Sequence, residues 1–204
     1  MSLALGFAVH SGWAALVVAG ERGGETWVLE RRRIELIEEA WGKFPYHGAQ
    51  QLGGEDGRAQ VKRVSAAARR LALEEVLAAV ERVREAGHPV VACGVLVGEP
   101  MPAWSLEEII AVHPRMHRAE GALFRQVLLD AGEAAGLATL AIPQKRLLCE
   151  AEAILGRSAA ELDVGLNGLR KALGAPWGKD QKGATLAALM ASRGMTKLTR
   201  GRKR

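Results

Sequence analysis

The sequence predicts an α/β protein with a mixed five-stranded sheet, three antiparallel strands and then two parallel ones, flanked by helices. Three short apolar runs joined by tight polar connections open the chain, which is typical of strands that pair antiparallel. A long stretch of helical period follows, and two further apolar runs alternate with helices. A strand that leads through a helix into a buried strand implies a right-handed parallel crossover. Extra helices are expected after the last strand.

The three opening strands are expected at Leu3–Val9, at Trp13–Ala19 and from Thr26 to about Leu36. His10-Ser11-Gly12 is the tight connection between the first two. Glu21–Gly24 precedes the third and ends in two adjacent glycines, which readily form a turn. Because their connections are short, these strands are expected to form an antiparallel meander.

The next part of the chain changes in character. Pro45 to Gly57 is rich in glycine and predicts a loop or lid. From about Ala59 to Ala86 apolar residues recur every three or four positions, which indicates one long helix with a buried stripe. Pro89–Val97 is continuously apolar, as in a parallel strand buried on both faces. Leu137–Ile142 is the fifth expected strand. Further helices are expected from Ser105, over His113–Gly136, Gln144–Leu155 and Ser158–Leu173, and from Asp180 to about Ser192.

Composition narrows the class of protein. The chain has 204 residues, of which 49% are hydrophobic and 25% charged, and this excludes a disordered chain, a fibre and a disulfide scaffold. Apolar runs are too short for a membrane span, and two widely separated cysteines suit a cytoplasmic protein. We expect a single domain over residues 1–192, with a helical part from about 144. Residues 193–204 are expected to form a basic, flexible tail.

A functional crevice is expected where parallel strands end. The carboxyl ends of neighbouring parallel strands meet at one edge of a sheet, and helices that leave on opposite sides open a crevice there. Ala8, Val9 and His10 end the first strand, and Gly98 and Glu99 follow the fourth. We therefore expect His10 and Glu99 to share this crevice.

Three short motifs accompany this order of elements. The first strand contains Gly6-Phe7-Ala8, and the second strand follows with Gly12-Trp13-Ala14. Glu99 comes directly after the fourth strand, and Gly178-Lys179-Asp180-Gln181-Lys182 opens the last helix. With these motifs the chain resembles the ribonuclease H-like superfamily over about residues 3–190. Within that superfamily its pattern is most similar to the Holliday-junction resolvase-type nucleases, as a remote member of a bacterial family.

The resemblance implies a nuclease site with one substitution. In the family the first strand carries an aspartate that bridges two catalytic metal ions, and Ala8 stands at that position. A two-metal site needs several converging carboxylates. Glu99 would be the second acid and Asp180 the last. The implied function is a ribonuclease H-like domain that binds structured nucleic acid, with metal-dependent nuclease activity weak or absent.

Polar residues near the expected crevice are the site candidates. If the protein cuts nucleic acid, the resemblance makes Glu99, Asp180 and His10 the catalytic residues. His117 and Glu120 are three positions apart, so that they share a helix face and could ligate one ion. The expected metal ligands are therefore Glu99, His117, Glu120 and Asp180. Magnesium or manganese is the expected ion, ahead of zinc.

Basic residues mark the expected nucleic-acid contacts. Aromatic residues make up only 4% of the chain, which argues against binding of single strands by base stacking. Duplex or structured nucleic acid held through its phosphates is the expected partner. The candidate contacts lie on the long helix, at the start of the last helix and in the tail: Arg63, Arg70, Lys179, Lys182, Arg200, Arg202 and Lys203.

Two alternatives stay open. The chain could be a metal-dependent enzyme for a small molecule or nucleotide that uses His10, Glu99, His117 and Glu120. It could also be a non-catalytic scaffold or oligomerisation module, and a homodimer is an expected assembly. His113, which precedes a proline, suits a loop that caps a helix. Pro45-Tyr46-His47 suits an anchor of the expected loop, or an element that gates a ligand.

Overall fold

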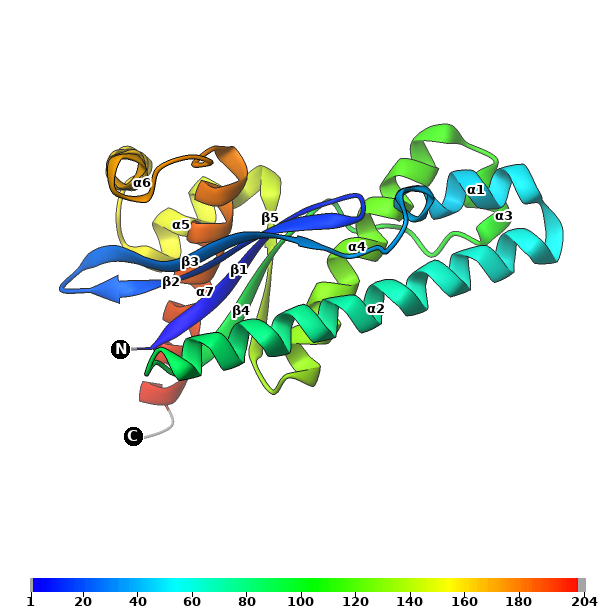
Figure 1. The fold of residues 1–204 in the computed structure, drawn as a ribbon. Helices are drawn as coiled ribbons and strands as arrows, with labels where there is room; N and C mark the ends of the chain where they lie inside the picture. The colour runs from blue at the N-terminus through cyan, green and yellow to red at the C-terminus, as the bar shows by residue number, and fades with distance from the viewer. Residues whose placement is uncertain (1, 202–204) are drawn as a thin grey trace.

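One five-stranded sheet forms the centre of the molecule, with the strand order β3-β2-β1-β4-β5 (Figure 1). The structure is a computed structural model that describes the backbone of residues 2–201 and the side chains of residues 2–194. The strands are β1 (Leu3–His10), β2 (Trp13–Arg22), β3 (Glu25–Glu35), β4 (Val90–Val97) and β5 (Ala138–Pro143). β1, β2 and β3 pair antiparallel, whereas β4 pairs parallel with both β1 and β5. This confirms the expected fold class.

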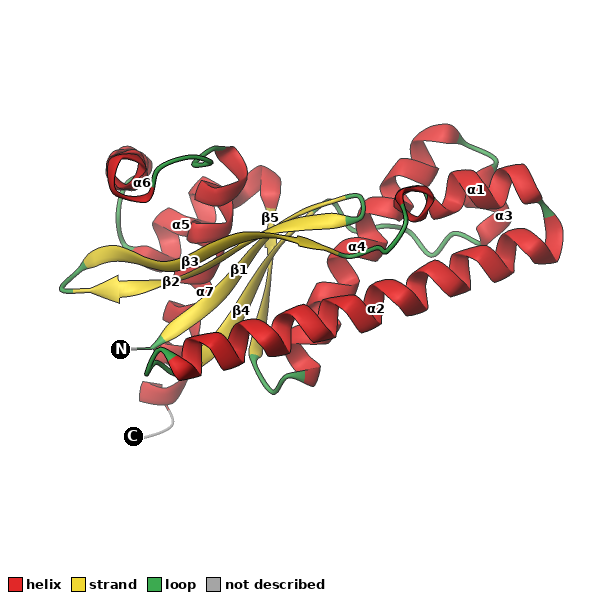
Figure 2. Cartoon of the chain, in the orientation of Figure 1, coloured by secondary structure: helices red, strands yellow, loops and turns green. Residues whose placement is uncertain are grey.

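Helices cover both faces of the sheet (Figure 2). They are α1 (Pro45–Leu52), α2 (Gly54–Glu85), α3 (Leu106–Ile110), α4 (His113–Ala134), α5 (Leu147–Leu155), α6 (Ala159–Leu173) and α7 (Lys179–Gly201), with short 3-10 turns η1 (Ala40–Lys43) and η2 (Gln144–Arg146). α2 and α4 pack on one face and α5, α6 and α7 on the other. Beyond the sheet, α1, α3 and the adjoining ends of α2 and α4 form a group that we call the helical lobe (Figure 1).

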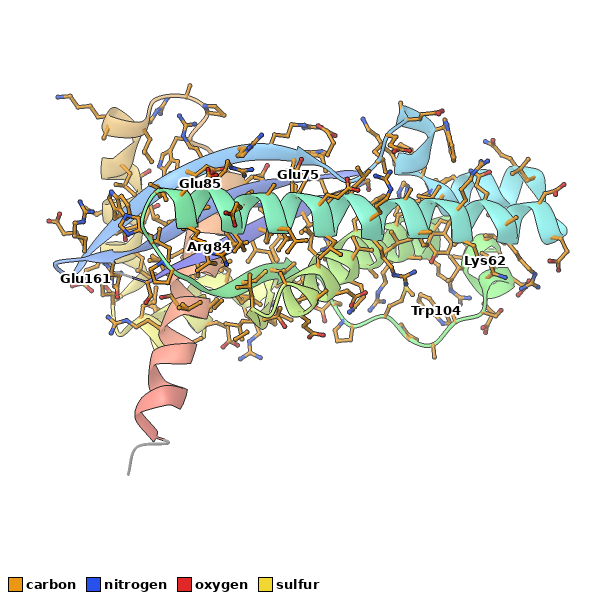
Figure 3. The ribbon with its side chains drawn as sticks, turned by 60° about the horizontal axis from the view of Figure 1, so that its bottom comes forward. Lys62, Glu75, Arg84, Glu85, Trp104 and Glu161 are labelled. Atoms are coloured by element: carbon orange, nitrogen blue, oxygen red, sulfur yellow. The ribbon has the colours of Figure 1, made fainter. Side chains whose placement is uncertain are left out.

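Alternation along β1 assigns each side chain to one of these two layers. Leu5 and Phe7 are fully buried against the α2 and α4 layer, whereas Ala4 and Ala8 face the α7 layer. Charged side chains such as Lys62 are carried on the outside of α2 (Figure 3). None of the described helices combines the length and apolarity that crossing a membrane would require.

α7 lies unusually close to the sheet because glycines make room for it. A Cβ atom at Gly6 of β1 would lie 1.8 Å from the carbonyl oxygen of Ala184. A Cβ atom at Gly94 of β4 would lie 2.2 Å from the carbonyl oxygen of Ala187. Only glycine fits at these two positions without moving the helix. The start of α7 is thereby held beside the carboxyl end of β1.

The loop or lid expected from Pro45 to Gly57 is wrong, because this segment forms α1 and the start of α2. Gly53 has a φ of 71° and Gly54 a φ of 48°, so that these two glycines make the break between the helices. Gly57 serves close packing instead, since a Cβ atom there would lie 2.6 Å from the carbonyl oxygen of Ala49. Gly48 likewise faces α2, since a Cβ atom there would lie 2.0 Å from the side chain of Gln60, so that two of the four glycines reflect the contact between two helices.

The last helix is longer than expected. α7 continues to Gly201, past the end expected near Ser192, so that the start of the expected basic tail is helical. The side chain of Arg200 lies outside the described side chains, and Arg202 and Lys203 lie outside the described residues. The division into a domain and a flexible tail stays a prediction.

Candidate functional site

His10 and Asp180 meet at the carboxyl end of β1. Alternation along β1 places His10 on the same side as Ala8, toward the start of α7. Its Nε2 atom lies 3.0 Å from Oδ2 of Asp180, and the ring stacks on Trp13 with 4.2 Å between centroids. The guanidinium of Arg33 covers the same indole at 3.9 Å. The structure therefore brings two of the three expected catalytic residues into contact.

Ala8 offers nothing to a cation at this place. It is 4% exposed and belongs to the apolar cluster between the sheet and α7. A metal centre that bridges two ions needs a carboxylate at such a converging position. The groups present at the end of β1, a buried methyl and a histidine–carboxylate pair, do not fit a two-metal centre.

Glu99, the third expected catalytic residue, has a different partner. It follows β4, is 58% exposed, and its Oε1 atom lies 3.3 Å from Nζ of Lys145 in η2. Among the described residues, no ion pair or hydrogen bond joins Glu99 to His10 or Asp180. β1 and β4 do lie side by side and parallel, as expected, but their terminal polar groups are engaged separately.

His117 and Glu120 lie in the helical lobe, on α4. Nδ1 of His117 is 3.6 Å from Oε2 of Glu120, so that the expected pairing across one helical turn is present. The structure gives this pair other neighbours, because His47 of α1 and His113 of α4 pack against it. The expected set of metal ligands is therefore divided between the end of the sheet and the helical lobe.

Three histidines form a compact group in the helical lobe. One nitrogen from each of His47, His113 and His117 can be chosen so that all three lie within 4.8 Å of one another. Nε2 of His47 is 3.3 Å from Nδ1 of His113, and Nε2 of His113 is 3.1 Å from Nε2 of His117. Among the described residues, this is the one group of three or more potential metal-ligating side chains.

A fully buried acid, Glu120, contacts this histidine group. Glu120 is 0% exposed, and its Oε1 atom lies 2.7 Å from Nδ1 of His47. Its Oε2 atom has no hydrogen-bond partner, because the 3.6 Å to His117 exceeds hydrogen-bonding distance. The pKa of Tyr46 is raised by burial and, to a smaller extent, by the charge of Glu120. An ionised carboxylate buried in this way requires nearby donors or cations.

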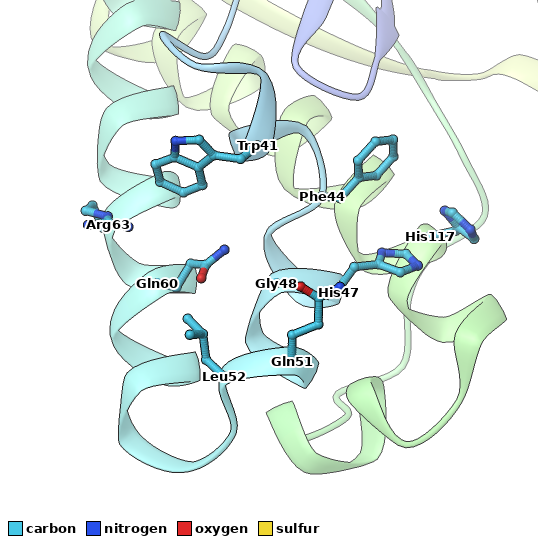
Figure 4. A pocket seen from close by; sticks show the side chains of 9 residues that line it. All are labelled: Trp41, Phe44, His47, Gly48, Gln51, Leu52, Gln60, Arg63 and His117. Carbon is cyan, nitrogen blue, oxygen red and sulfur yellow. The ribbon is translucent and has the colours of Figure 1, made fainter.

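Two of the histidines, His47 and His117, border a cavity of about 660 Å³ between α1 and α2 (Figure 4). Its apolar side is formed by Trp41, Phe44 and Leu52, and its polar side by Gln51 and Gln60. Arg63 is its cation, and the guanidinium lies 4.7 Å from the ring of Trp41. The cavity can therefore hold a small molecule with both an apolar and an anionic part.

A second cavity, of about 820 Å³, opens beside the end of β4. Gly98 and Glu99 line it together with three arginines, Arg69, Arg118 and Arg125. Burial lowers the pKa of Arg125, whose Nε atom has no hydrogen-bond partner. Anionic groups are the natural ligands of such a cavity.

The residues expected to contact nucleic acid differ in whether a neighbouring acid already balances their charge. Arg70 is held between two carboxylates, Glu74 at 2.9 Å and Glu38, which balance its charge. Lys182 donates to the side chain of Asn167. Lys179 is exposed at the start of α7 and makes no described contact with an acid. Arg63 and Lys179 are therefore the described candidates best suited to bind phosphate.

Sequence reasoning missed His47 and His113 as partners of His117. His113 was expected in a capping loop, but it is the first residue of α4. Its spacing of four from His117 was the available signal, since such residues share a helix face. His47 gave none, because it lies 66 positions before His113 and was expected in a loop.

Comparisons with known proteins agree with the fold. No family model matches the sequence, and no curated protein matches it. The structure is similar to that of RuvC from T. thermophilus in complex with a Holliday junction substrate, with 14% sequence identity and a TM-score of 0.53, over 97% of this chain and 96% of that chain. A structure of Thermus thermophilus RuvC gives 15% identity and a TM-score of 0.52 over 97% of each chain. The chain therefore has the ribonuclease H-like fold, in a form that remotely resembles a Holliday-junction resolvase.

Proposed function

We propose that this protein binds duplex or branched nucleic acid through phosphate groups at the carboxyl end of β4 and the start of α7, without two-metal cleavage. The observation that carries the proposal is the cavity beside β4, which three arginines line at the edge of a resolvase-like sheet. The similar RuvC structure is described as a complex with a Holliday junction, which makes a four-way junction the first ligand to test. A cytoplasmic location belongs to the same proposal.

Arg125 is the central group in this proposal. Its guanidinium fits between two glycines, since a Cβ atom would lie 3.3 Å from its Nη1 atom at Gly98 and 2.5 Å at Gly121. No described acid forms an ion pair with it, whereas Arg69 lies 3.9 Å from Asp130. A half-buried guanidinium without a counter-ion gains from a phosphate oxygen, because charge-assisted hydrogen bonds are strong where water is partly excluded. The geometry therefore favours an anionic ligand at this edge.

Weak or absent cleavage follows from the groups at the end of β1. Ala8 contributes no oxygen, Asp180 is paired with His10, and Glu99 is paired with Lys145. Water attack on a phosphodiester by a two-metal mechanism needs carboxylates that hold both ions. We expect no cleavage of a junction or duplex in magnesium or manganese, measured on denaturing gels.

The test is fluorescence anisotropy with a four-way junction, a duplex and a single strand, at several salt concentrations. We expect the junction and the duplex to bind more tightly than the single strand, and affinity to fall steeply with salt because counterions are released. Arg125→Gln and Lys179→Glu should each weaken binding about tenfold, as expected for loss of a charge-assisted contact of ~1.5 kcal/mol. The matched control is Lys171→Glu on the exposed side of α6, which should bind like the parent.

Two results would overturn the proposal. One is unchanged binding by both variants at an unchanged melting temperature. The other is loss of binding when residues 195–204 are deleted while Arg125→Gln binds normally, because the end of the chain and not the cavity would then hold the nucleic acid.

A further inference from the structure

We propose that His47, His113 and His117 form a zinc site whose fourth coordination position opens toward the cavity lined by Trp41 and Arg63. The proposal concerns the helical lobe and is independent of nucleic-acid binding at the end of the sheet. It rests on the distances within the histidine group, on the buried Glu120 behind it, and on the cavity in front of it.

The three rings come from two helices that are packed together. His113 and His117 are one turn apart on α4, and His47 reaches them from α1. In a tetrahedral site with zinc–nitrogen bonds of about 2.0–2.1 Å, ligand nitrogens are about 3.3 Å apart. Nε2 of His47 is 3.3 Å from Nδ1 of His113, whereas Nε2 of His117 is 3.1 Å from the other ring nitrogen of His113, Nε2. With one nitrogen taken from each ring, the three lie within 4.8 Å of one another. To bind one ion, the rings must rotate so that a single nitrogen of His113 faces the same point as one nitrogen each of His47 and His117.

Glu120 has the features of the carboxylate that orients a zinc-binding histidine. Its Oε1 atom accepts a hydrogen bond from Nδ1 of His47 at 2.7 Å, which leaves the lone pair of Nε2 facing the other two histidines. Its Oε2 atom is buried without a hydrogen-bond partner. A buried carboxylate with a hydrogen-bond partner on only one of its oxygens is costly. A divalent cation bound to the other ring nitrogen of His47 offsets that cost. This acid is therefore an independent indication of a cation at the site.

The chemistry of the ligands selects the ion. Three imidazoles suit zinc and its neighbours in the transition series, whereas magnesium and calcium prefer oxygen ligands. Three protein ligands with an open fourth position are characteristic of sites that bind water or substrate, because structural zinc sites are closed by four protein ligands. Here the open position is expected on the side of the cavity, since His47 and His117 both line it.

The same cavity indicates the class of ligand. Arg63 is its cation, and no described acid pairs with it. Trp41, Phe44 and Leu52 supply an apolar wall beside it. An anion with an apolar substituent would place a phosphate or carboxylate oxygen on the metal and its remaining charge toward Arg63. Inorganic phosphate is the simplest probe of this arrangement.

The test begins with the full chain after treatment with a chelator. Zinc is titrated by calorimetry, and cobalt is used as a spectroscopic substitute whose visible absorption reports tetrahedral coordination. We expect one ion per chain. His113→Ala and His117→Ala, both at exposed positions, should lower zinc affinity at least a hundredfold. Glu120→Gln should lower it about ten- to a hundredfold, as loss of an orienting carboxylate does.

His88→Gln is the matched control, because this histidine lies at the opposite end of α2 and contacts Trp27. It should bind zinc like the parent, and the circular dichroism of each metal-free variant establishes that it is folded. Failure of the parent chain to take up stoichiometric zinc, or retention of zinc by both alanine variants, would overturn the proposal.

The open position is tested separately. Inorganic phosphate should shift the visible spectrum of the cobalt-loaded protein, and Arg63→Gln should weaken that shift severalfold while leaving cobalt affinity unchanged. A spectrum that phosphate does not alter would contradict the open fourth position.

Discussion

Two histidine–carboxylate pairs in this protein share their chemistry and differ in their surroundings. His10 and Asp180 lie 3.0 Å apart at the end of the sheet, with 42% and 31% of their side chains exposed. His47 and Glu120 lie 2.7 Å apart in the helical lobe, with 23% and 0% exposed. Water screens the first pair and stabilises its members when they separate, so that it contributes little to folding. The second pair cannot exchange its partners for water.

The fold alone would place the functional site at the end of the sheet, whereas the burial of these groups points to the helical lobe. The end of the sheet is where the ribonuclease H-like resemblance implies chemistry, yet Ala8 stands there in place of an acid and Asp180 is paired with His10. The helical lobe lies outside that expectation, and it contains a buried acid beside three histidines. A fold resemblance therefore indicates where to look first, and burial of unpaired polar groups indicates where a ligand is needed.

The largest expected effect is on the stability of the sheet, and it comes from a substitution that displaces α7 but leaves the helical lobe in place. Gly6→Ala places a methyl group against the carbonyl oxygen of Ala184, so that α7 must shift and carry Asp180 away from His10. We expect a loss of about 3 kcal/mol in the free energy of unfolding, the upper range for overpacking, measured with urea. Zinc uptake by the folded variant should be unchanged, because α4 packs on the other face of the sheet and α1 lies beyond the sheet.

The control for this variant is Gly165→Ala on α6, where a Cβ atom meets nothing within 4 Å. Because alanine is the better helix former, this change should stabilise the protein by up to ~1 kcal/mol. If Gly6→Ala were as stable as the parent, α7 would not lie as close to β1 as the structure has it.

A smaller effect on stability is expected when either carboxylate, Glu120 or Asp180, is replaced by its amide. Glu120→Gln places an amide NH2 group at the position of Oε2, where the structure offers no hydrogen-bond partner, and we expect it to cost about 1–3 kcal/mol in the metal-free protein. Asp180→Asn removes the charge from a partly exposed pair and should cost below ~1 kcal/mol. Urea unfolding of both variants in a chelator measures the difference. Equal costs would mean that the two pairs are equally accessible to water.

The sheet could be predicted from sequence because its signals are local. The short apolar run of Leu3–Val9, the tight turns and the continuous apolar run of Val90–Val97 each depend on neighbouring residues. The glycines of Pro45–Gly57 were ambiguous, since glycine serves both turns and close helix contacts. At Gly57 the reason for glycine is the backbone of Ala49, which sequence alone does not place nearby.

The candidate sites could also be predicted only where the signal lies within one element. His117 and Glu120 were paired correctly from their spacing of three, and Asp180 was indicated by the resemblance at the start of the last helix. His47 joins them only because α1 packs on α4, and no local pattern encodes that contact. Spacing along one element is visible in a sequence, whereas the meeting of two helices depends on the packing of the whole chain.

The smallest expected effect tests whether Glu120 acts on the titration of its neighbour Tyr46. Tyr46 is the single tyrosine of the chain, so that the ultraviolet absorbance of tyrosinate reports this residue alone. Burial, and then the charge of Glu120, raise the pKa of Tyr46 above its ordinary value. Glu120→Gln removes the negative charge that opposes formation of tyrosinate, and the pKa of Tyr46 should therefore fall. It should stay above the ordinary value, because the larger cause is burial, which the variant retains. An alkaline titration of both proteins in a chelator makes the comparison, and identical curves would mean that Glu120 does not act on the pKa of Tyr46.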